Sequence, residues 1–313
     1  MLKIMKEFKP FIISIIVIIG LLFAQAMTDL ALPDYMSNIV NVGIQQAGIE
    51  DSIPQAIREK EMDKIKLFLS REEKDNLEKN YSLKSKEDFN NKDYKKIVKN
   101  FPILEDEPLY FLNEDIKDLE ILESYMAKSM LVISTIEKAG QEGSKMPETG
   151  ENPFGDLPEG TDPFLALGNI PEEQLQEMVG KIESQIEELP ESLLGQSAIS
   201  YIKVQYEDMG MDMEKTQSNY ILYIGGIMLL IALAGMVASI SVGFLASRTA
   251  AGISRNLRDK VFAKVTSFSN GEFNEFSTAS LITRTTNDIQ QIQQFTVMLL
   301  RMVFYAPILG IGG

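Results

Sequence analysis

Residues 219–245 read NYILYIGGIMLLIALAGMVASISVGFL, and this stretch decides the fold class of the chain. It lies inside a run of 32 uncharged residues, 216–247, between Lys215 and Arg248. A helix needs about 20 mainly apolar residues to cross the hydrocarbon layer of a membrane. The run therefore predicts a membrane-spanning helix, which we place with its polar extension at residues 217–269.

Small residues recur at every fourth position along this run: Gly235, Ser239, Gly243, Ser247 and Ala251. Residues four apart lie near one another on a helix, so the pattern predicts a packing stripe where a second helix can approach closely. Small residues are also common in membrane helices without such a role. The sequence leaves both interpretations open.

An earlier apolar segment predicts a first span at residues 10–32. Residues 11–28 carry no charge, and Lys3, Lys6 and Lys9 lie before them in a short segment, residues 1–9. The same pattern, with Ala24-Gln25-Ala26 as a cleavage site, also fits a secretory signal peptide. Composition alone does not separate a retained helix from a cleaved signal.

A last apolar stretch, residues 302–313, holds 12 residues, which is too few to cross a membrane. We expect the chain to end inside a helix that a membrane would require to be longer. We therefore interpret it as the N-terminal fragment of a longer polypeptide. Arg301 begins this stretch, and we expect its long side chain to reach back toward the membrane interface.

Basic residues beside the first two spans predict the orientation. Three lysines precede the first span, and five basic residues follow the second: Arg248, Arg255, Arg258, Lys260 and Lys264. Short cytoplasmic segments of membrane proteins are enriched in Lys and Arg. We therefore expect a multi-pass protein of the cell membrane, with a cytoplasmic N-terminus and an extracellular segment at residues 33–216.

The chain of 313 residues contains no Cys, His or Trp, and this removes whole classes of mechanism. It has no thiol nucleophile, no zinc–thiolate site and no imidazole acid, base or metal ligand. Residues 45–215 hold 20 basic and 38 acidic side chains, and the rest of the chain holds 10 and 7. Nucleic-acid binding needs a basic face. We expect no nucleic-acid partner and identify no catalytic, metal or cofactor residue.

The acidic segment has the periodicity of a mainly helical domain. Ser70-Arg71-Glu72-Glu73 fits a capping box, and residues 114–139 place apolar side chains at helical spacing. Residues 140–171 hold six Gly and five Pro, which predicts a long surface loop before a helix restarts at Pro171. The acidic clusters at 105–107 and 156–162 lack the spacing of a calcium loop, so we expect them to be solvated surface.

Residues 248–301 predict a helical hairpin beside the membrane, with a break at Asn270-Gly271. Both arms carry apolar residues at helical spacing, and the second belongs to a third helix at residues 278–313. The tip contains two aromatic residues, Phe273 and Phe276. They fit a docking surface for another protein, or a staple that closes the hairpin, and both interpretations stay open.

The hairpin resembles the first intracellular loop of type I ABC exporters. The resemblance rests on LRDKVF (257–262) and FSTASLITRTTNDI (276–289), and it is closest to half-transporters of Gram-positive heterodimeric multidrug exporters. The stretch LPDYMSNIVNVGI (32–44) and residues 301–307 are similar to the same group. The resemblance is good over residues 1–45 and from about residue 200 onward, and it is loose between them.

This resemblance implies an all-α membrane protein with the type I transmembrane fold. The chain would supply the first two and a half of six helices, with a mainly helical extracellular insertion. It implies a retained first helix and a coupling helix at residues 270–277. The residues that would contact a nucleotide-binding domain are Glu272, Phe273, Asn274, Glu275, Phe276 and Ser277.

The implied function is that of the transmembrane portion of an ATP-driven exporter of multidrug or lipophilic compounds. The implied partners are a second half-transporter in a heterodimer, nucleotide-binding domains that bind ATP with Mg²⁺, and the lipid bilayer. The chain itself has no Walker A loop, because Gly180-Lys181 is followed by Ile182 and lacks the earlier glycine. We therefore expect no enzymatic activity from this chain alone.

Two other functions fit parts of the pattern. A membrane sensor would place an extracellular ligand-binding domain between two spans, but it leaves residues 302–313 without a role. A tethered structural or adhesion protein leaves the aromatic tip without one. Within the exporter hypothesis, Asp29 and Asp34 near the outer end of the first span could attract cationic compounds, although interfacial carboxylates are common.

Overall fold

The structure is a computed structural model of the chain, and it describes residues 6–114, 116, 119–142, 163–168, 170, 174, 179–180, 190–269, 271 and 277–312. The chain divides into two compact units. We call residues 1–39 together with 222–313 the membrane unit, and residues 40–221 the insertion unit.

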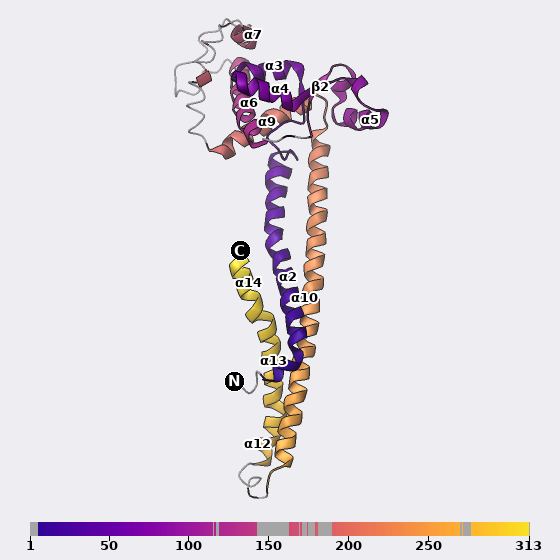
Figure 1. Cartoon of the computed structure of the whole chain (residues 1–313), viewed down its shortest axis with the longest axis vertical. Coiled ribbons are helices and arrows are strands. Elements are labelled where there is room, and N and C mark those ends of the chain that lie inside the picture. The colour runs from indigo at the N-terminus through magenta and orange to yellow at the C-terminus, as the bar shows by residue number, and fades with distance from the viewer. Residues whose placement is uncertain are drawn as a thin grey trace. The chain divides into compact units, whose positions relative to one another are not determined.

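Long helices make up the membrane unit (Figure 1). A 3-10 turn (Lys6–Phe11) leads into α2 (Ile12–Asn38), which a π-helical turn (Ile39–Gln45) extends. The longest helix is α10 (Met213–Thr266). The chain then returns through α12 (Thr278–Thr283), α13 (Ile289–Met298) and α14 (Phe304–Gly312), with π-helical turns at Arg284–Asp288 and Leu299–Val303.

Among the described residues, three helical stretches are long and apolar enough to cross a membrane, judged by length and composition: Glu7–Gln45, Met213–Thr266 and Ala279–Gly312. The first continues past Pro33, where the sequence pattern suggested an end. The third includes Arg301 and the residues before it. The part of the expected helix at residues 278–313 that is able to cross a membrane is therefore longer than the 12 residues after Arg301.

A small apolar core holds the membrane unit together. Ile18 and Leu22 from α2 pack with Val242 and Ala246 from α10, and Leu300 completes the cluster. Many other large apolar side chains of these helices are exposed. Solvent-exposed apolar faces of this extent are unfavourable in water and favourable in lipid, which agrees with the composition of a membrane protein.

The insertion unit contains a cluster of shorter helices and three strands (Figure 1). In chain order its elements are β1 (Ala56–Arg58), α3 (Glu59–Leu67), α4 (Arg71–Asn80), β2 (Tyr81–Lys84), α5 (Asn91–Asn100), β3 (Leu109–Leu112), α6 (Leu119–Glu142), α7 (Pro163–Gly168) and α9 (Glu191–Asp208). Two 3-10 turns lie at Lys86–Asp88 and Pro102–Glu105.

The three strands form an antiparallel sheet in the order β1-β3-β2. Leu109 of the central strand pairs with Arg58 on one side and with Lys84 on the other. This sheet corrects the all-α expectation, although the insertion is mainly helical. The strands have three or four residues, too few to display a clear alternation, and β1 pairs with residues far along the chain.

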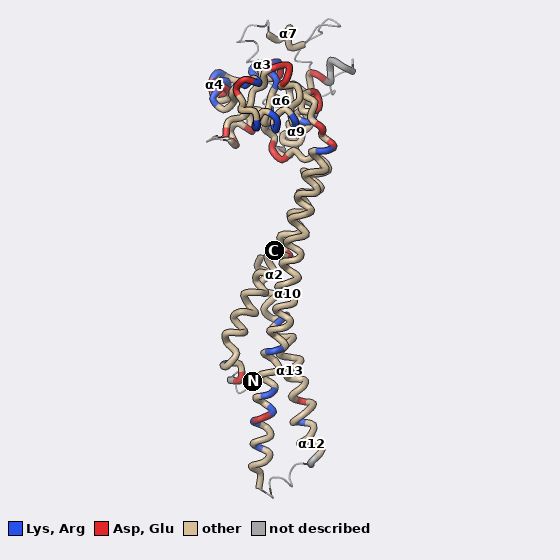
Figure 2. The backbone as a smooth tube through the Cα atoms, turned by 90° about the vertical axis from the view of Figure 1, so that its right-hand side faces the viewer, with Lys and Arg blue, Asp and Glu red and all other residues tan. Residues whose placement is uncertain are grey.

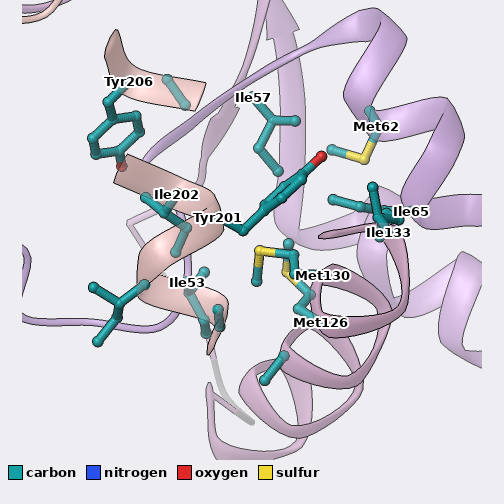
Figure 3. Close-up of a cluster of buried hydrophobic side chains, with 14 of the residues drawn as sticks. Ile53, Ile57, Met62, Ile65, Met126, Met130, Ile133, Tyr201, Ile202 and Tyr206 are labelled. Atoms are coloured by element: carbon teal, nitrogen blue, oxygen red, sulfur yellow. The ribbon is translucent and has the colours of Figure 1, made fainter. Parts of the chain in front are cut away.

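The core of the insertion unit lies between α3, α6 and α9 (Figure 3). Met126, Met130 and Ile133 of α6 follow helical spacing, and each is fully buried. Ile65 of α3 and Ile202 of α9 pack into the same cluster. This core gives the acidic insertion a folded framework of its own.

Local signals in the insertion sequence are partly confirmed. The capping box exists: the Ser70 hydroxyl accepts from the Glu73 backbone N–H, and the Glu73 carboxylate accepts from the Ser70 N–H at 2.8 Å. The helix expected over residues 114–139 is α6. The loop expected at 140–171 and the helix expected after Pro171 lie mostly outside the described residues.

Candidate functional site

Two glycines of α10 lie close to side chains near the N-terminal end of the chain, Thr28 of α2 and Phe11 of the preceding 3-10 turn. A Cβ atom built on Gly235 would lie 2.7 Å from Oγ1 of Thr28, a distance that real Cβ atoms do not adopt. Further along α10, a Cβ on Gly252 would lie 2.5 Å from the ring of Phe11. Glycine at both positions therefore leaves room on α10 for these two side chains.

The predicted packing stripe coincides with this contact face only at its start. Gly235 is buried, Ser239 and Gly243 are half-buried, and Ser247 is exposed. On an α-helix, two side chains four residues apart are rotated by about 400° around the helix axis. A strict four-residue repeat therefore drifts by about 40° around the helix at each step. The buried face of α10 instead combines spacings of three and four: Gly235, Ala238, Val242, Ala246, Thr249 and Ile253. The stripe as a whole stays a prediction.

Two glycines of α10 provide a matched test of this contact. Gly235→Ala is expected to lower the melting temperature of the detergent-solubilised chain, because the added methyl group displaces the Thr28 side chain. Overpacking of this kind costs about 1 to 3 kcal/mol. At Gly243, no atom of the described residues outside the helix's own nearby backbone and the two chain neighbours lies within 4 Å of the place that an added Cβ would take. Gly243→Ala is therefore expected to raise stability by up to about 1 kcal/mol, through helix propensity. Equal shifts for both variants would contradict this packing.

A cavity of about 480 Å³ opens between the helices of the membrane unit. Its polar lining side chains are Gln25, Gln294, Arg301 and Tyr305. Its apolar lining comes from all three helical stretches: Leu22, Val242, Val297, Met298 and Met302. Small-molecule sites are typically concave and mainly apolar, with a few convergent polar groups, and this cavity has that composition.

The two carboxylates noted near the outer end of the first span differ in their surroundings. Asp29 accepts a hydrogen bond from the Tyr305 hydroxyl, which links α2 to α14. Asp34 lies exposed on α2. Neither residue belongs to the lining of the cavity, and their proposed role toward cationic compounds stays a prediction.

Charged side chains are distributed unevenly along the helices of the membrane unit (Figure 2). The C-terminal part of α10 carries five basic residues, and one of them, Lys260, forms an ion pair with the buried Glu7. This ion pair links the 3-10 turn before α2 to the polar part of α10.

A buried charge network joins three helices of the insertion unit. The Tyr201 hydroxyl of α9 donates to Glu61 of α3 at 2.5 Å, and the Lys64 Nζ lies 3.0 Å from Glu61 and 2.6 Å from Glu137 of α6. Arg58 extends the network by donating to Gln205 at 2.7 Å and to Asp208 at 3.1 Å. Only 3% of the Glu61 surface is exposed.

The network shifts the pKa values of Lys64 and Tyr201. Burial lowers the pKa of the Lys64 ammonium, but its hydrogen bonds to Glu137 and Glu61 outweigh this effect, so the pKa is raised overall. Burial, reinforced by the Glu61 carboxylate, raises the pKa of the Tyr201 hydroxyl. Lys64 is therefore charged and Tyr201 neutral at pH 7, as donation to Glu61 requires.

Sequence reasoning missed this network. One local signal was available: Glu61 lies on the same face of α3 as the buried Met62 and Ile65, where a carboxylate needs a partner. The sequence does not identify that partner, because Tyr201 lies 140 residues further along the chain.

Most of the predicted coupling helix lies outside the described residues. These are Glu272, Phe273, Asn274, Glu275 and Phe276. Ser277 is described, and its hydroxyl accepts from the Ser280 N–H at 3.2 Å as the N-cap of α12. The contact of this segment with a nucleotide-binding domain stays a prediction.

Comparison with known proteins gives a family match for the C-terminal part of the chain. Residues 194–313 match the family model of the ABC transporter transmembrane region. This segment contains most of α9 and all of α10 and α12 to α14. No solved structure matches the chain.

The chain also has partial relatives among bacterial proteins. It is 36% identical over 93 residues to the uncharacterized ABC transporter ATP-binding protein Mb1304c of Mycobacterium bovis, covering 30% of this chain and 16% of that protein. It is 35% identical over 89 residues to the uncharacterized ABC transporter ATP-binding protein YfiB of Bacillus subtilis, covering 28% and 16%. The match thus spans about a sixth of the length of each relative.

The two findings agree with the fold. The family match covers two of the three described helical stretches that are able to cross a membrane. Residues 194–313 of this membrane protein are therefore similar to the transmembrane region of ABC transporters.

Proposed function

We propose that this chain supplies the transmembrane part of an ABC exporter subunit that moves multidrug or lipophilic compounds out of the cell. The observation that carries the proposal is the match of residues 194–313 to the ABC transporter transmembrane region. The apolar cavity with a few polar groups supports a route for lipophilic compounds.

The length of α10 supports coupling to a cytoplasmic motor. Its 54 residues correspond to about 80 Å at 1.5 Å per residue, whereas the hydrocarbon layer is about 30 Å thick. A long polar arm therefore continues beyond the membrane. In our proposal the segment 272–277 at its end docks into a nucleotide-binding domain, where ATP and Mg²⁺ bind.

The orientation and the second subunit belong to the same proposal. The basic residues at the C-terminal part of α10 favour a cytoplasmic hairpin, which leaves the insertion outside the cell. A second half-transporter completes the translocation pathway, and the resemblance to heterodimeric exporters favours a different chain over an identical one. A sensor with two spans is disfavoured because a third helix, Ala279–Gly312, is also able to cross.

Topology is testable because the chain contains no cysteine. A single cysteine at Gly271 is expected to react with a membrane-impermeant maleimide only after the cells are permeabilised. A cysteine at the exposed Asn100 in α5 is expected to react in intact cells. Labelling of both positions from the same side would exclude the proposed orientation.

The activity itself is testable in inverted membrane vesicles that contain the complete subunit with its partner. We expect uptake of a lipophilic dye that requires ATP and Mg²⁺ and that vanadate abolishes. The chain of residues 1–313 by itself is expected to show no ATP hydrolysis above background. Dye uptake that is indifferent to ATP would argue against an ABC exporter.

A further inference from the structure

Arg301 has an unusual position for a charged residue. It is the only charged side chain between Asp288 and the end of α14, so it interrupts an otherwise apolar stretch of a helix that is able to cross a membrane. A guanidinium in or beside hydrocarbon is costly unless it meets water, a partner or a ligand. A charged residue in this position therefore points to a partner or a ligand close to its side chain.

Arg301 has no protein partner within the described part of the chain. The ion pairs and hydrogen bonds of the described residues do not include it. Its side chain instead lines the 480 Å³ cavity together with the amides of Gln25 and Gln294. These groups combine one positive charge with neutral donors.

The other walls of the cavity are apolar. Val242 comes from α10, and Val297 and Met298 come from the helix that carries Arg301. The flexible, polarizable thioethers of methionine adapt to ligands of different shapes. The carboxylate of Asp29 is not part of this lining, and the Tyr305 hydroxyl donates to it.

We propose that this cavity binds an amphiphile with an anionic head, with a carboxylate or phosphate at Arg301 and an alkyl tail along the Val242, Val297 and Met298 wall. The planar guanidinium matches the two oxygens of either head group. The proposal rests on the proposed function insofar as it names a class of transported compound, but binding itself requires no ATP. The anion comes from one of two sources, a membrane phospholipid or a compound in transit.

The test uses the full chain with the subunits that copurify with it, in nanodiscs of phosphatidylcholine and without nucleotide. The probe is dodecanoic acid with a terminal diazirine, and the matched probe has the same chain and a trimethylammonium head. Photolabelling is read by intact mass. Arg301→Gln is expected to raise the half-saturating concentration of the anionic probe about tenfold or more, because a hydrogen bond to a charged group is lost. The cationic probe is expected to be unaffected.

Three controls separate a binding role from a structural one. Arg301→Lys keeps the charge but not the planar guanidinium, and it is expected to retain part of the labelling that Arg301→Gln loses. Met298→Trp fills the cavity without changing its charge and is expected to abolish labelling. Arg248→Gln removes an exposed charge of α10 outside the cavity and is expected to have no effect. Melting curves check that each variant folds. If Arg301→Gln does not fold, the labelling of Arg301→Lys and Met298→Trp tests the proposal.

Other outcomes overturn the proposal. Equal losses for Arg301→Gln and Arg248→Gln, or a preference of the original chain for the cationic probe, exclude an anion site at Arg301. Replacing phosphatidylcholine by phosphatidylglycerol distinguishes the sources, because competition with the probe identifies a lipid head group and unchanged labelling identifies a compound in transit. Failure of ATP-driven dye uptake with intact probe binding would refute the proposed function and leave this site standing.

Discussion

Replacing Glu61 by alanine is expected to lower the free energy of unfolding of the insertion unit by about 3 to 5 kcal/mol. Glu61 is almost completely buried, and it accepts from Tyr201 and pairs with Lys64. Its removal takes away the carboxylate to which the Tyr201 hydroxyl donates, and it leaves Lys64 with an ion pair to Glu137. The cost arises because buried donors that lose their acceptors are not rehydrated.

Hydrogen exchange measures this loss in the full chain, where the insertion unit contains no tryptophan to report its unfolding. Amide protection in α3, α6 and α9 is expected to fall by about 100-fold or more, since each 1.4 kcal/mol is a factor of ten. Glu61→Gln keeps an acceptor for Tyr201 and is expected to cost less than alanine. The membrane helices should keep their protection.

Glu78→Ala is the matched control. Glu78 also pairs with a lysine, Lys66, at 2.8 Å, but 59% of its side chain is exposed. An exposed ion pair contributes about 0 to 1 kcal/mol, so this variant is expected to differ little from the original chain. If the amides of α3, α6 and α9 are protected as well in Glu61→Ala as in Glu78→Ala, water or a rearranged partner replaces the network.

These two carboxylates show how far sequence reasoning reaches in this chain. The membrane helices were predictable, because a hydrocarbon layer imposes one requirement, a long apolar run, and residues 216–247 meet it locally. The capping box at Ser70 was predictable for the same reason, since its two partners lie three residues apart. Glu61 and Glu78 look alike in the sequence, and only the fold buries one of them.

The features that escaped prediction depend on residues distant in sequence. The small sheet joins β1 to β3 across three α-helices, and no local pattern specifies that register. The cavity gathers Gln25, Val242 and Arg301 from three separate helical stretches. The sequence pointed to Arg301 as an isolated charge, but it suggested only a side chain that reaches the interface. The described geometry adds the cavity, and with it a chemical reason for the charge.

Replacing both Phe273 and Phe276 by alanine is expected to reduce ATP-driven transport by the complete exporter at least about tenfold, because truncating aromatic residues at the centre of a protein interface costs about 2 kcal/mol or more. Both residues belong to the segment that we propose as the coupling helix. The expected signature is uncoupling: basal ATP hydrolysis persists, and its stimulation by the transported dye is lost. Dye uptake and phosphate release from the same vesicles measure the two quantities.

The alternative role of these aromatic residues, a staple that closes the hairpin, predicts a different result. Loss of a staple destabilises the hairpin itself, so hydrogen exchange should accelerate in the last turns of α10 and in α12, and less folded protein should be recovered. Loss of docking leaves that protection unchanged. Phe262→Ala provides the control, because Phe262 is a 64% exposed phenylalanine on α10, outside the proposed coupling segment. Uncoupling that is confined to the Phe273 and Phe276 variant, with an intact hairpin, would assign these two residues to the contact through which ATP drives the membrane helices. An unstable hairpin, or equal loss of transport in Phe262→Ala, would remove that assignment.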